Sequence, residues 1–456
     1  MHLASYRPRP SAQHSRRAHL GAPVDGASAA AFRIFFGAVM LFSCIRFVAR
    51  GWVQQFYVEP GFHFGWPGFE WLTPWPAWGL HLHMALLCLS ALCVMLGLFY
   101  RLSALVFFLS FTCLELFDQT HYLNHYYLVS LIALLCCMLP LHRVASLDAL
   151  RGREGGFGAS VPYATVFLLR AQLAITYFYA GVAKLGDDWL QRAQPLTTWL
   201  QVHADVPVLG PLLTAPGTAH VMAWAGAVFD LSIGALLWWP RSRRFAYLAV
   251  IGFHVSTGLL FPIGVFPLVM IALTAVFFEP DWPRRLLRRF AASASAAVQA
   301  PQPRRNLGAL PTALLAGYLA LQVLMPLRHL LYPGEVNWTE EGFRFAWRVM
   351  LIEKTGHVQL RVRDPKSGQS WHVSPSEHLT RMQRQMMSTQ PDMIASYARA
   401  IARQYRAQGY REVEVYADAW ASLNGRPAQR LIDPEANLAQ PDRPFAHRSY
   451  VLPLKR

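Results

Sequence analysis

The chain has 456 residues, of which 54% are hydrophobic and only 15% carry a charge, and its formal net charge is +16. A soluble globular domain carries roughly 25% charged residues, so this composition excludes an ordinary soluble protein. Apolar runs of about twenty residues recur through the first three quarters of the chain, and this is the length that crosses a bilayer core. We therefore expect an α-helical polytopic membrane protein with about nine transmembrane helices.

The first segment, residues 1–28, is basic and rich in proline, and no apolar signal-peptide core follows it directly. We interpret it as a tail that its arginines hold in the cytoplasm. The short stretch Pro262-Ile263-Gly264 joins the seventh and eighth expected spans, so these two can also form a re-entrant pair. The expected spans cover residues 29–48, 78–99, 102–118, 122–141, 161–183, 220–239, 244–262, 264–278 and 311–331, with ends known to within a few residues.

The basic residues are distributed unevenly between the two sides of this arrangement. With the N-terminus in the cytoplasm, the cytoplasmic connections, including the Ala/Ser/Pro-rich linker 291–306, collect most of the arginines, and the outer connections between spans hold only Arg50, Lys184 and Arg192. This is the positive-inside bias of membrane proteins, and it explains the net charge without a nucleic-acid partner. The preference for arginine over lysine suggests a GC-rich bacterial genome, so we expect the bacterial inner membrane.

The last part of the chain, residues 332–456, is much more polar than the helical domain expected over residues 29–331. Because the number of spans is odd, this polar region is expected on the extracytoplasmic side. Its patterning predicts an α+β domain. We expect strands within 345–373 with turns at Thr355-Gly356 and Ser367-Gly368, an amphipathic helix over 376–407 and a further strand over 411–423.

Several ionisable groups fall inside the apolar spans, where they are costly and by default indicate function. We expect Arg33 to extend from the inner end of the first span to the lipid headgroups. We expect Arg170 and Asp230, both near mid-depth, to form a buried structural ion pair. The candidates are Arg33, Glu115, Asp118, His125, Arg170, Lys184, Asp230, His254 and His329.

Four of these groups are expected in the outer half of the bundle. The direction of each span places His125, Lys184, His254 and His329 there, although they come from four different spans. Aromatic residues between the first two spans are expected to form an interfacial belt or to wall a site for a flat aromatic ligand.

In the stretch YFYAGVAKLGDDW, residues 177–189, the apolar run ends at Lys184. A lysine at such a border can extend to the headgroups. Alternatively it is partly desolvated, which favours a neutral amine that can act as a base. The neighbours Asp187 and Asp188 would favour the ammonium form if they pointed inward.

The six cysteines all lie in apolar runs and form no CxxC pattern, so we expect small buried side chains and neither disulfides nor a metal site.

The stretch YFYAGVAKLGDDW resembles the active-site segment of the vitamin K-dependent γ-glutamyl carboxylases, a group within the carboxylase-like (HTTM) membrane proteins. The resemblance covers residues 30–453. It continues in order through FRIFFGAVML, FDQTHYLNHYYL, FDLSIGALLWW, FHVSTGLLFPIGVFPLVM, FFEPDWPRRL, NWTEEGFRFAWRVM and DAWASLNGRPAQRLIDP.

The resemblance implies an enzyme that converts reduced vitamin K, a naphthohydroquinone, with O2 into its epoxide. The oxygenated quinone then removes a γ-proton from a glutamate of an exported polypeptide, and the carbanion captures CO2. By resemblance, Lys184 is the base that deprotonates the hydroquinone, and His125 assists it beside Asn124. The remaining positions implied for the substrate and quinone pocket are Tyr177, His254, His329, Trp338 and Phe343. The implied partners are the lipid bilayer, a membrane quinone and a Glu-containing exported polypeptide, and no metal is implied.

This sequence departs from the family pattern at positions that bear on carboxylation. Ala183 replaces a second lysine of the animal enzymes, and Phe343 takes the place of a tyrosine associated with glutamate handling. The sequence also ends with the segment VLPLKR, where the family continues into a larger lumenal region, so we expect epoxidation to be better supported than carboxylation of a tethered substrate. The alternatives are a quinol epoxidase or oxygenase that does not carboxylate glutamate, and a non-enzymatic membrane scaffold or transporter, for which the FPIGVFP break is the only hint.

Overall fold

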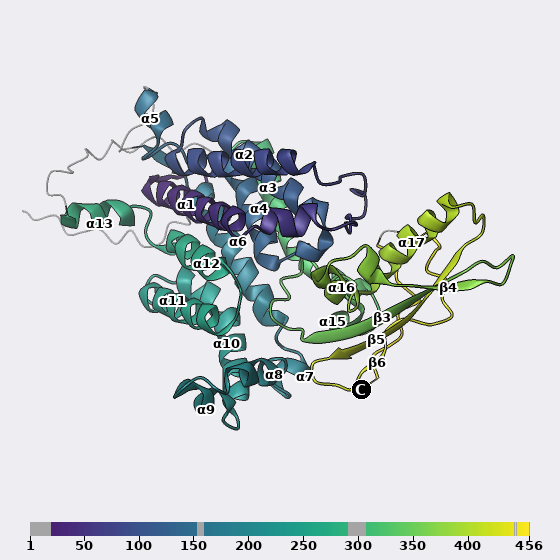
Figure 1. The fold of residues 1–456 in the computed structure, drawn as a ribbon. Helices are drawn as coiled ribbons and strands as arrows, with labels where there is room; N and C mark the ends of the chain where they lie inside the picture. The colour runs from purple at the N-terminus through teal and green to yellow at the C-terminus, as the bar shows by residue number, and fades with distance from the viewer. Residues whose placement is uncertain (1–19, 153–158, 291–306, 442, 444, 456) are drawn as a thin grey trace, which may run out of the picture.

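The computed structural model describes residues 20–152, 159–290, 307–441, 443 and 445–455. Most of the basic tail 1–28 and the linker 291–306 lie outside these residues. The described chain forms a bundle of helices with a sheet-containing C-terminal domain against one end (Figure 1).

Helices lie at all the ranges expected to span the membrane. Six are long and apolar enough to cross a bilayer within the described residues: α1, α2, α3, α6, α10, and α14 with its continuation η5. Helices α4 and α12 are apolar but shorter, so nine spans remains a prediction. The bounds are α1 Ala27–Ala49, α2 Ala77–Leu96, α3 Tyr100–Phe117, α4 Asn124–Met138, α6 Tyr163–Val182, α10 Thr218–Trp238, α11 Arg243–Leu260, α12 Phe266–Thr274 with η4 Ala275–Phe277, and α14 Ala309–Leu324 with η5 Met325–Leu331.

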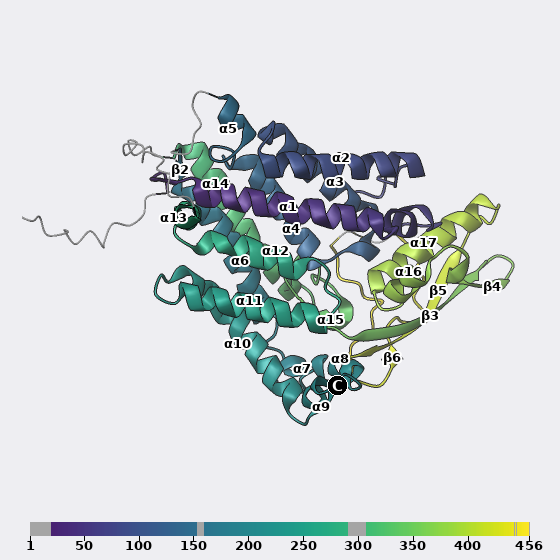
Figure 2. The same ribbon diagram turned by 60° about the vertical axis from the view of Figure 1, so that its left-hand side comes forward.

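The connections between helices gather at the two ends of the bundle (Figures 1 and 2). The end away from the C-terminal domain carries β1 Pro23–Asp25, which pairs antiparallel with β2 Ser160–Pro162, together with α5 Leu147–Arg151 and α13 Trp282–Phe290. The opposite end, beside the C-terminal domain, carries η1 Gln54–Val58, η2 Gln119–His121, α7 Asp187–Leu190, α8 Leu196–Leu200, η3 Gln201–His203, α9 Leu209–Thr214 and α15 Val336–Thr339. The arginine-rich connections within the described residues therefore share one end.

Two arginines inside the bundle do not behave as the sequence suggested. Arg33 does not reach the headgroups: it is fully buried and donates to the carbonyl oxygens of Leu141 (3.2 Å) and Val94 (2.9 Å). Arg170 does not pair with Asp230: it donates to the carbonyl oxygens of Val276 (2.9 Å) and Phe278 (2.8 Å). Carbonyl groups left free at helix ends satisfy guanidinium donors without a carboxylate, so both predictions were wrong.

The C-terminal domain packs helices on one face of a sheet with strand order β4-β3-β5-β6. Alternate residues of β3 and β5 face its core, including Val358, Leu360, Val415 and Ala417. The strands are β3 Lys354–Arg363, β4 Ser370–Val373, β5 Glu414–Leu423 and β6 Gln429–Arg430. The helices are η6 Pro375–Glu377, α16 Arg381–Met387 and α17 Pro391–Ala407.

The strand over 411–423 and the turn at Ser367-Gly368 are confirmed, since β5 ends at Leu423 and Gly368 has φ +73°. The turn at Thr355-Gly356 is wrong, because both residues lie within β3. The single helix over 376–407 is also wrong. It breaks before Pro391, because proline disfavours helical backbone in the residue that precedes it.

Polar contacts attach this domain to the end of the bundle. Gln383 of α16 donates to Asp118 Oδ2 at the end of α3 (2.9 Å). Arg426, in the loop after β5, donates to both carboxylate oxygens of Asp188 in α7 (2.6 and 2.8 Å). The loop 340–353 also reaches the end of the helices, where Asn124 of α4 donates to the carbonyl oxygen of Arg348 (3.3 Å).

Candidate active site between the bundle and the C-terminal domain

Lys184 lies just beyond α6 and folds back into the bundle. Its Nζ donates to Asp230 Oδ2 on α10 at 2.8 Å and to the carbonyl oxygen of Ala180 at 3.2 Å. The ammonium group also lies 5.2 Å from the centre of the Trp189 ring. Lys184 and Asp230 are each only 5% exposed. Lys184 is therefore buried and does not extend to the headgroups.

Glycine at position 181 allows this pairing. A Cβ atom at Gly181 would lie 2.7 Å from the backbone nitrogen of Leu231, a distance that real Cβ atoms do not adopt. Since glycine lacks that atom, α6 and α10 approach closely at the level of Asp230. The lysine and its carboxylate partner are thus brought together by the packing of two helices.

The acidic neighbours of Lys184 in sequence do not point inward. Asp188 faces the C-terminal domain and accepts hydrogen bonds from Arg426 and Asn424. Although partial burial opposes the shift, these hydrogen bonds lower the pKa of Asp188. Asp187 accepts a hydrogen bond from Gln191 at 3.0 Å and is exposed. The carboxylate that meets Lys184 is therefore Asp230.

Tyr177 and His254 lie beside the Lys184–Asp230 pair and line one cavity with it. The Tyr177 hydroxyl and His254 Nε2 share a hydrogen bond of 2.9 Å between α6 and α11. His254 Nδ1 is buried with no partner among the described residues. A cavity of about 100 Å³ lies between these two side chains and the Lys184–Asp230 pair. Three of the expected site residues, Tyr177, Lys184 and His254, therefore share one cavity.

His125 and Asn124 line a second, larger cavity of about 410 Å³ at the start of α4. The two cavities share the walls Ile263, Phe266, Val349 and Met350. The centre of the Phe266 ring lies 5.6 Å from the His125 ring and 5.5 Å from the His254 ring. His125 and Lys184 are therefore in neighbouring compartments separated by apolar side chains.

The other three expected pocket residues line neither cavity. His329 lies in η5, where its Nδ1 is 2.8 Å from the carbonyl oxygen of Pro326. Trp338 is completely buried in the core of the C-terminal domain and donates through Nε1 to the carbonyl oxygen of Leu452 (2.7 Å). Phe343 is half-buried in the loop after α15. These three residues therefore lie outside the two cavities, and Trp338 belongs to the C-terminal core.

Two cavity-lining features were missed by sequence reasoning. Val349 and Met350 come from a segment expected to be strand, yet they form the wall between the compartments. Arg46 was assigned no role, although it lines the larger cavity. Its position near the outer end of an apolar span is a signal in the sequence for such a place.

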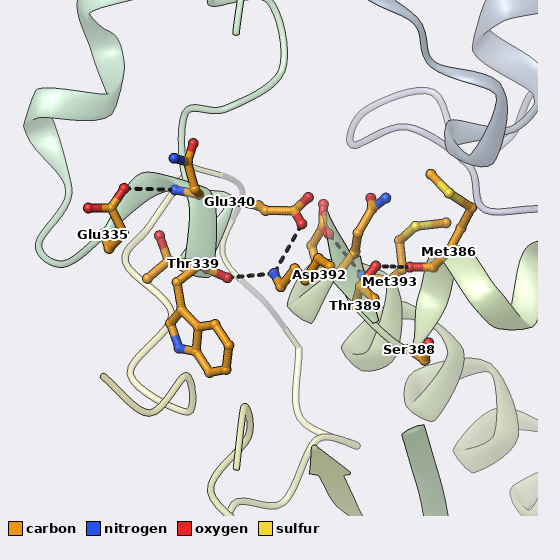
Figure 3. Close-up of polar contacts among 12 residues, drawn as sticks. Glu335, Thr339, Glu340, Met386, Ser388, Thr389, Asp392 and Met393 are labelled. Atoms are coloured by element: carbon orange, nitrogen blue, oxygen red, sulfur yellow. Dashed lines mark hydrogen bonds and ion pairs between the residues drawn. The ribbon is translucent and has the colours of Figure 1, made fainter. Parts of the chain in front are cut away.

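A separate cluster of buried charges lies at the base of the loop that carries Val349 and Met350 (Figure 3). Lys354 of β3 donates to Glu340 Oε1 (3.1 Å) and to the carbonyl oxygen of Trp338 (2.8 Å), and Arg344 pairs with Asp392 of α17. Burial raises the pKa of Glu340 and lowers the pKa of Lys354, although their mutual attraction opposes both shifts. This cluster joins the segment 338–344 to β3 and α17, so we assign it a structural role.

The amino-acid sequence matches two family models. Residues 22–282 match the HTTM domain. This range includes every bundle helix that lines the two cavities. Residues 308–456 match the lumenal domain of vitamin K-dependent gamma-carboxylase. No solved structure matches the chain.

Proposed function

This chain belongs to the HTTM and vitamin K-dependent γ-carboxylase family, and we propose that it is a membrane enzyme that uses a reduced naphthoquinone, O2 and CO2 to carboxylate glutamate in an exported polypeptide. The observation that carries the proposal is the buried Lys184–Asp230 pair, with Nζ and Oδ2 2.8 Å apart, in a cavity that also contains Tyr177 and His254. A buried amine paired with a carboxylate is a group that can exchange protons with a ligand.

The larger cavity fits the body of a naphthoquinone. Its volume is about 410 Å³, within the range of small-molecule sites, and its walls include the aromatic rings of Trp52, Phe56, Tyr126 and Phe266. Flat aromatic ligands pack well against such rings. When bound, the reduced quinone would supply, with O2, the strong base that takes a γ-proton from glutamate.

The Lys184–Asp230 pair acts as one base in this proposal. A proton of the Lys184 ammonium first passes across the 2.8 Å hydrogen bond to Asp230 Oδ2, and the neutral amine then takes a hydroxyl proton from the ligand. The pair gains one proton and becomes an ammonium beside a neutral acid. In this account Lys184 receives the substrate proton and Asp230 stores the equivalent proton.

The remaining residues position and shield the ligand. His125 and Asn124 lie at the start of α4 on the wall of the larger cavity, where a ring nitrogen and an amide can bond to the quinone oxygens. The side chains of Ile263, Phe266, Val349 and Met350 separate the cavities and exclude water. Exclusion of water protects a strong base from being quenched. For the ligand to meet Lys184, its reacting edge must enter between these four side chains.

A quinol epoxidase that does not carboxylate glutamate remains the second candidate. It is favoured by Phe343, which has no hydroxyl at the position matched to the family tyrosine and lies outside both cavities. A scaffold or transporter is less well supported, because a mere scaffold does not require Lys184, Tyr177 and His254 around one cavity.

The test is incubation of the purified protein in detergent with vitamin K hydroquinone, O2, labelled CO2 and a Glu-containing peptide. Label in the peptide together with quinone epoxide supports the carboxylase. Epoxide without label supports the epoxidase. The absence of both products from folded protein that binds the quinone would overturn both candidates.

A further inference from the structure

The C-terminal domain carries an open groove of about 940 Å³ that the proposed chemistry does not use. It is lined by residues 356–360 of β3, by residues 372–376 at the end of β4 and beyond, and by side chains of α16. Most of these residues are exposed. The groove therefore lies at the surface, where the sheet meets α16.

The groove follows a stretch of β3 beside which the described chain places only one neighbouring strand. β3 pairs with β5 along its whole length, from Lys354 to Arg363, but β4 pairs only with residues 360–363. After Val373 the chain leaves the sheet and enters η6. The hydrogen-bonding groups of an antiparallel strand alternate between its two sides, so alternate residues of 356–359 direct their N–H and C=O groups away from β5. A free edge of this kind is a template for a further strand.

The side chains around the groove carry positive charge or none. The basic members are His357, His372, Arg381 and Arg384, all of them exposed, and no aspartate or glutamate is among the described residues that line it. Glu377 of η6 is close in sequence but does not line the groove. Within the part of the chain that the structure describes, neither guanidinium has a hydrogen bond or an ion pair. Two free arginines in a groove without a carboxylate favour an acidic ligand.

Helix α16 borders both this groove and the larger cavity. Arg381 and Arg384 line the groove, whereas Met382 lines the cavity. Figures 1 and 2 show the helix between the end of the bundle and the sheet. A helix is about 10 Å across, and an extended chain advances about 3.3 Å per residue. A chain that leaves the groove therefore needs only about three or four residues to pass α16 and reach the cavity wall.

We propose that this groove is the docking site of the polypeptide substrate, which binds as an extended acidic segment added to the sheet at the free edge of β3. Backbone groups of the segment pair with those of residues 356–359, and its carboxylates lie against Arg381 and Arg384. Because glutamates are the residues to be modified, a segment rich in them supplies the negative charge that the groove lacks. The inference rests on the proposed function for the identity of the polypeptide as a substrate, and it adds where and in which conformation that polypeptide binds.

The test is equilibrium binding of labelled peptides to the full-length protein in detergent, without quinone, O2 or CO2. The probe is a peptide of about ten residues in which glutamate alternates with threonine, a residue that favours strands, and fluorescence anisotropy at low salt follows its binding. The same peptide with glutamine in place of glutamate should bind at least about tenfold more weakly, because it has no charge for the arginines. A peptide with methyl groups on its backbone nitrogens should also bind at least about tenfold more weakly, because it cannot donate to the edge of β3.

The charge recognition is tested by Arg381→Gln combined with Arg384→Gln. This variant should weaken binding of the glutamate peptide about 2- to 30-fold, the range for two solvent-exposed ion pairs. The matched control is Arg403→Gln combined with Arg406→Gln, since these arginines have the same spacing on α17, are exposed and lie outside the groove. The control variant should bind the peptide as the wild type does. All four substitutions are at exposed positions, so both variants should fold.

The strand addition is tested by amide hydrogen exchange of the same complex. The glutamate peptide should slow exchange over residues 356–359 and leave exchange over β6, at the opposite edge of the sheet, unchanged. Unchanged exchange over residues 356–359 in the bound state would overturn the proposed mode of binding.

The inference as a whole would be overturned by a wild-type protein that does not bind the glutamate peptide, by equal binding of the glutamine peptide, or by wild-type affinity in the Arg381/Arg384 variant. Because binding is measured without turnover, the result is independent of the proposed activity. The expected binding pattern in a protein that forms neither epoxide nor carboxylated peptide would preserve the inference and reject the proposed function. Carboxylation of the peptide with the same KM in the wild type and in the Arg381/Arg384 variant would do the reverse.

Discussion

Lys184 Nζ lies 2.8 Å from Asp230 Oδ2, and the two side chains meet between α6 and α10 with about 5% of each exposed. The sequence distance between them is 46 residues. Taking two charges out of water is costly unless they remain paired, so each residue holds the other in place. The pair can therefore stabilise the bundle as well as transfer a proton, and the two roles need separate tests.

Asp230→Asn is expected to lower epoxide formation by about 10²- to 10⁴-fold, the range for loss of a general base, because the proton from Lys184 then has no acceptor. Lys184→Met should cause a loss of similar size, and the double variant should be little worse than either, since residues that act as a unit are not additive. Epoxide assays on the four proteins measure this. Losses that multiply in the double variant would show that the residues act independently.

The structural role is tested by Lys184→Met combined with Asp230→Leu. Removing one member of a buried pair typically costs about 3–5 kcal/mol, whereas replacing both with apolar residues is often neutral. Thermal unfolding in detergent should show that the apolar pair restores the stability lost in each single variant. Epoxide formation should remain absent, and its recovery would exclude the pair as the base.

Tyr177→Phe is expected to destabilise the bundle by about 1–3 kcal/mol, because it leaves His254 Nε2 buried without its partner at 2.9 Å. His254 Nδ1 already has no partner among the described residues, so the ring has no other polar contact to hold it. Thermal unfolding measures the effect. Phe178→Leu, at an exposed position on the same helix, is the control that should leave the stability nearly unchanged. An unchanged melting temperature in Tyr177→Phe would contradict the assigned hydrogen bond.

Lys354→Met is expected to destabilise the C-terminal domain by about 3–5 kcal/mol, because it leaves Glu340 buried without its charged partner. The Lys354 and Glu340 side chains are only 2% and 8% exposed. The double variant Lys354→Met/Glu340→Gln should recover part of the loss, since the remaining amide is neutral. Chemical unfolding followed by fluorescence measures both effects, and a double variant less stable than Lys354→Met would show that the charge pair is not the source of the loss.

Asp392 supplies a pH dependence whose sign can be derived. Burial raises the pKa of this carboxyl, but the charges of Arg344 and Arg448 outweigh it, and the pKa in the folded protein lies below its ordinary value. The stability that Asp392 contributes is therefore fully present above about pH 4, the unfolded value, and is lost as the pH falls towards the folded value. Melting temperatures from pH 7 to pH 3 should fall more steeply for the wild type than for Asp392→Asn. Parallel curves would contradict this contribution.

The helices could be predicted from the sequence because each apolar run of membrane length is a local signal. The pairing of side chains between helices could not. Arg170 and Asp230 have opposite charges and lie at similar depth, which suggested an ion pair. In the structure, however, the Arg170 guanidinium donates to carbonyl groups around η4. Asp230 instead contacts Lys184, because Gly181 allows α6 and α10 to approach closely. Such choices depend on helix rotation and close approach, which no single segment specifies.

The same distinction applies to the expected site residues. Tyr177, Lys184 and His254 share a cavity because they lie on helices that pack directly together. Trp338 was placed in the pocket by family resemblance, but the fold of the C-terminal domain buries it against Leu452. The wall formed by Val349 and Met350 comes from an irregular loop, and its position depends on how that loop lies over the bundle.

The central claim, that Lys184 removes the quinol proton, is tested most directly by the initial rate of epoxide formation in Lys184→Met and in the control Lys366→Met. Lys366 is an exposed lysine between β3 and β4 of the C-terminal domain, and it lines neither cavity. The account predicts that Lys366→Met forms vitamin K epoxide at the wild-type rate. It predicts that folded Lys184→Met, which still binds the hydroquinone, forms epoxide at least about 10²-fold more slowly. A wild-type rate in Lys184→Met would contradict the claim.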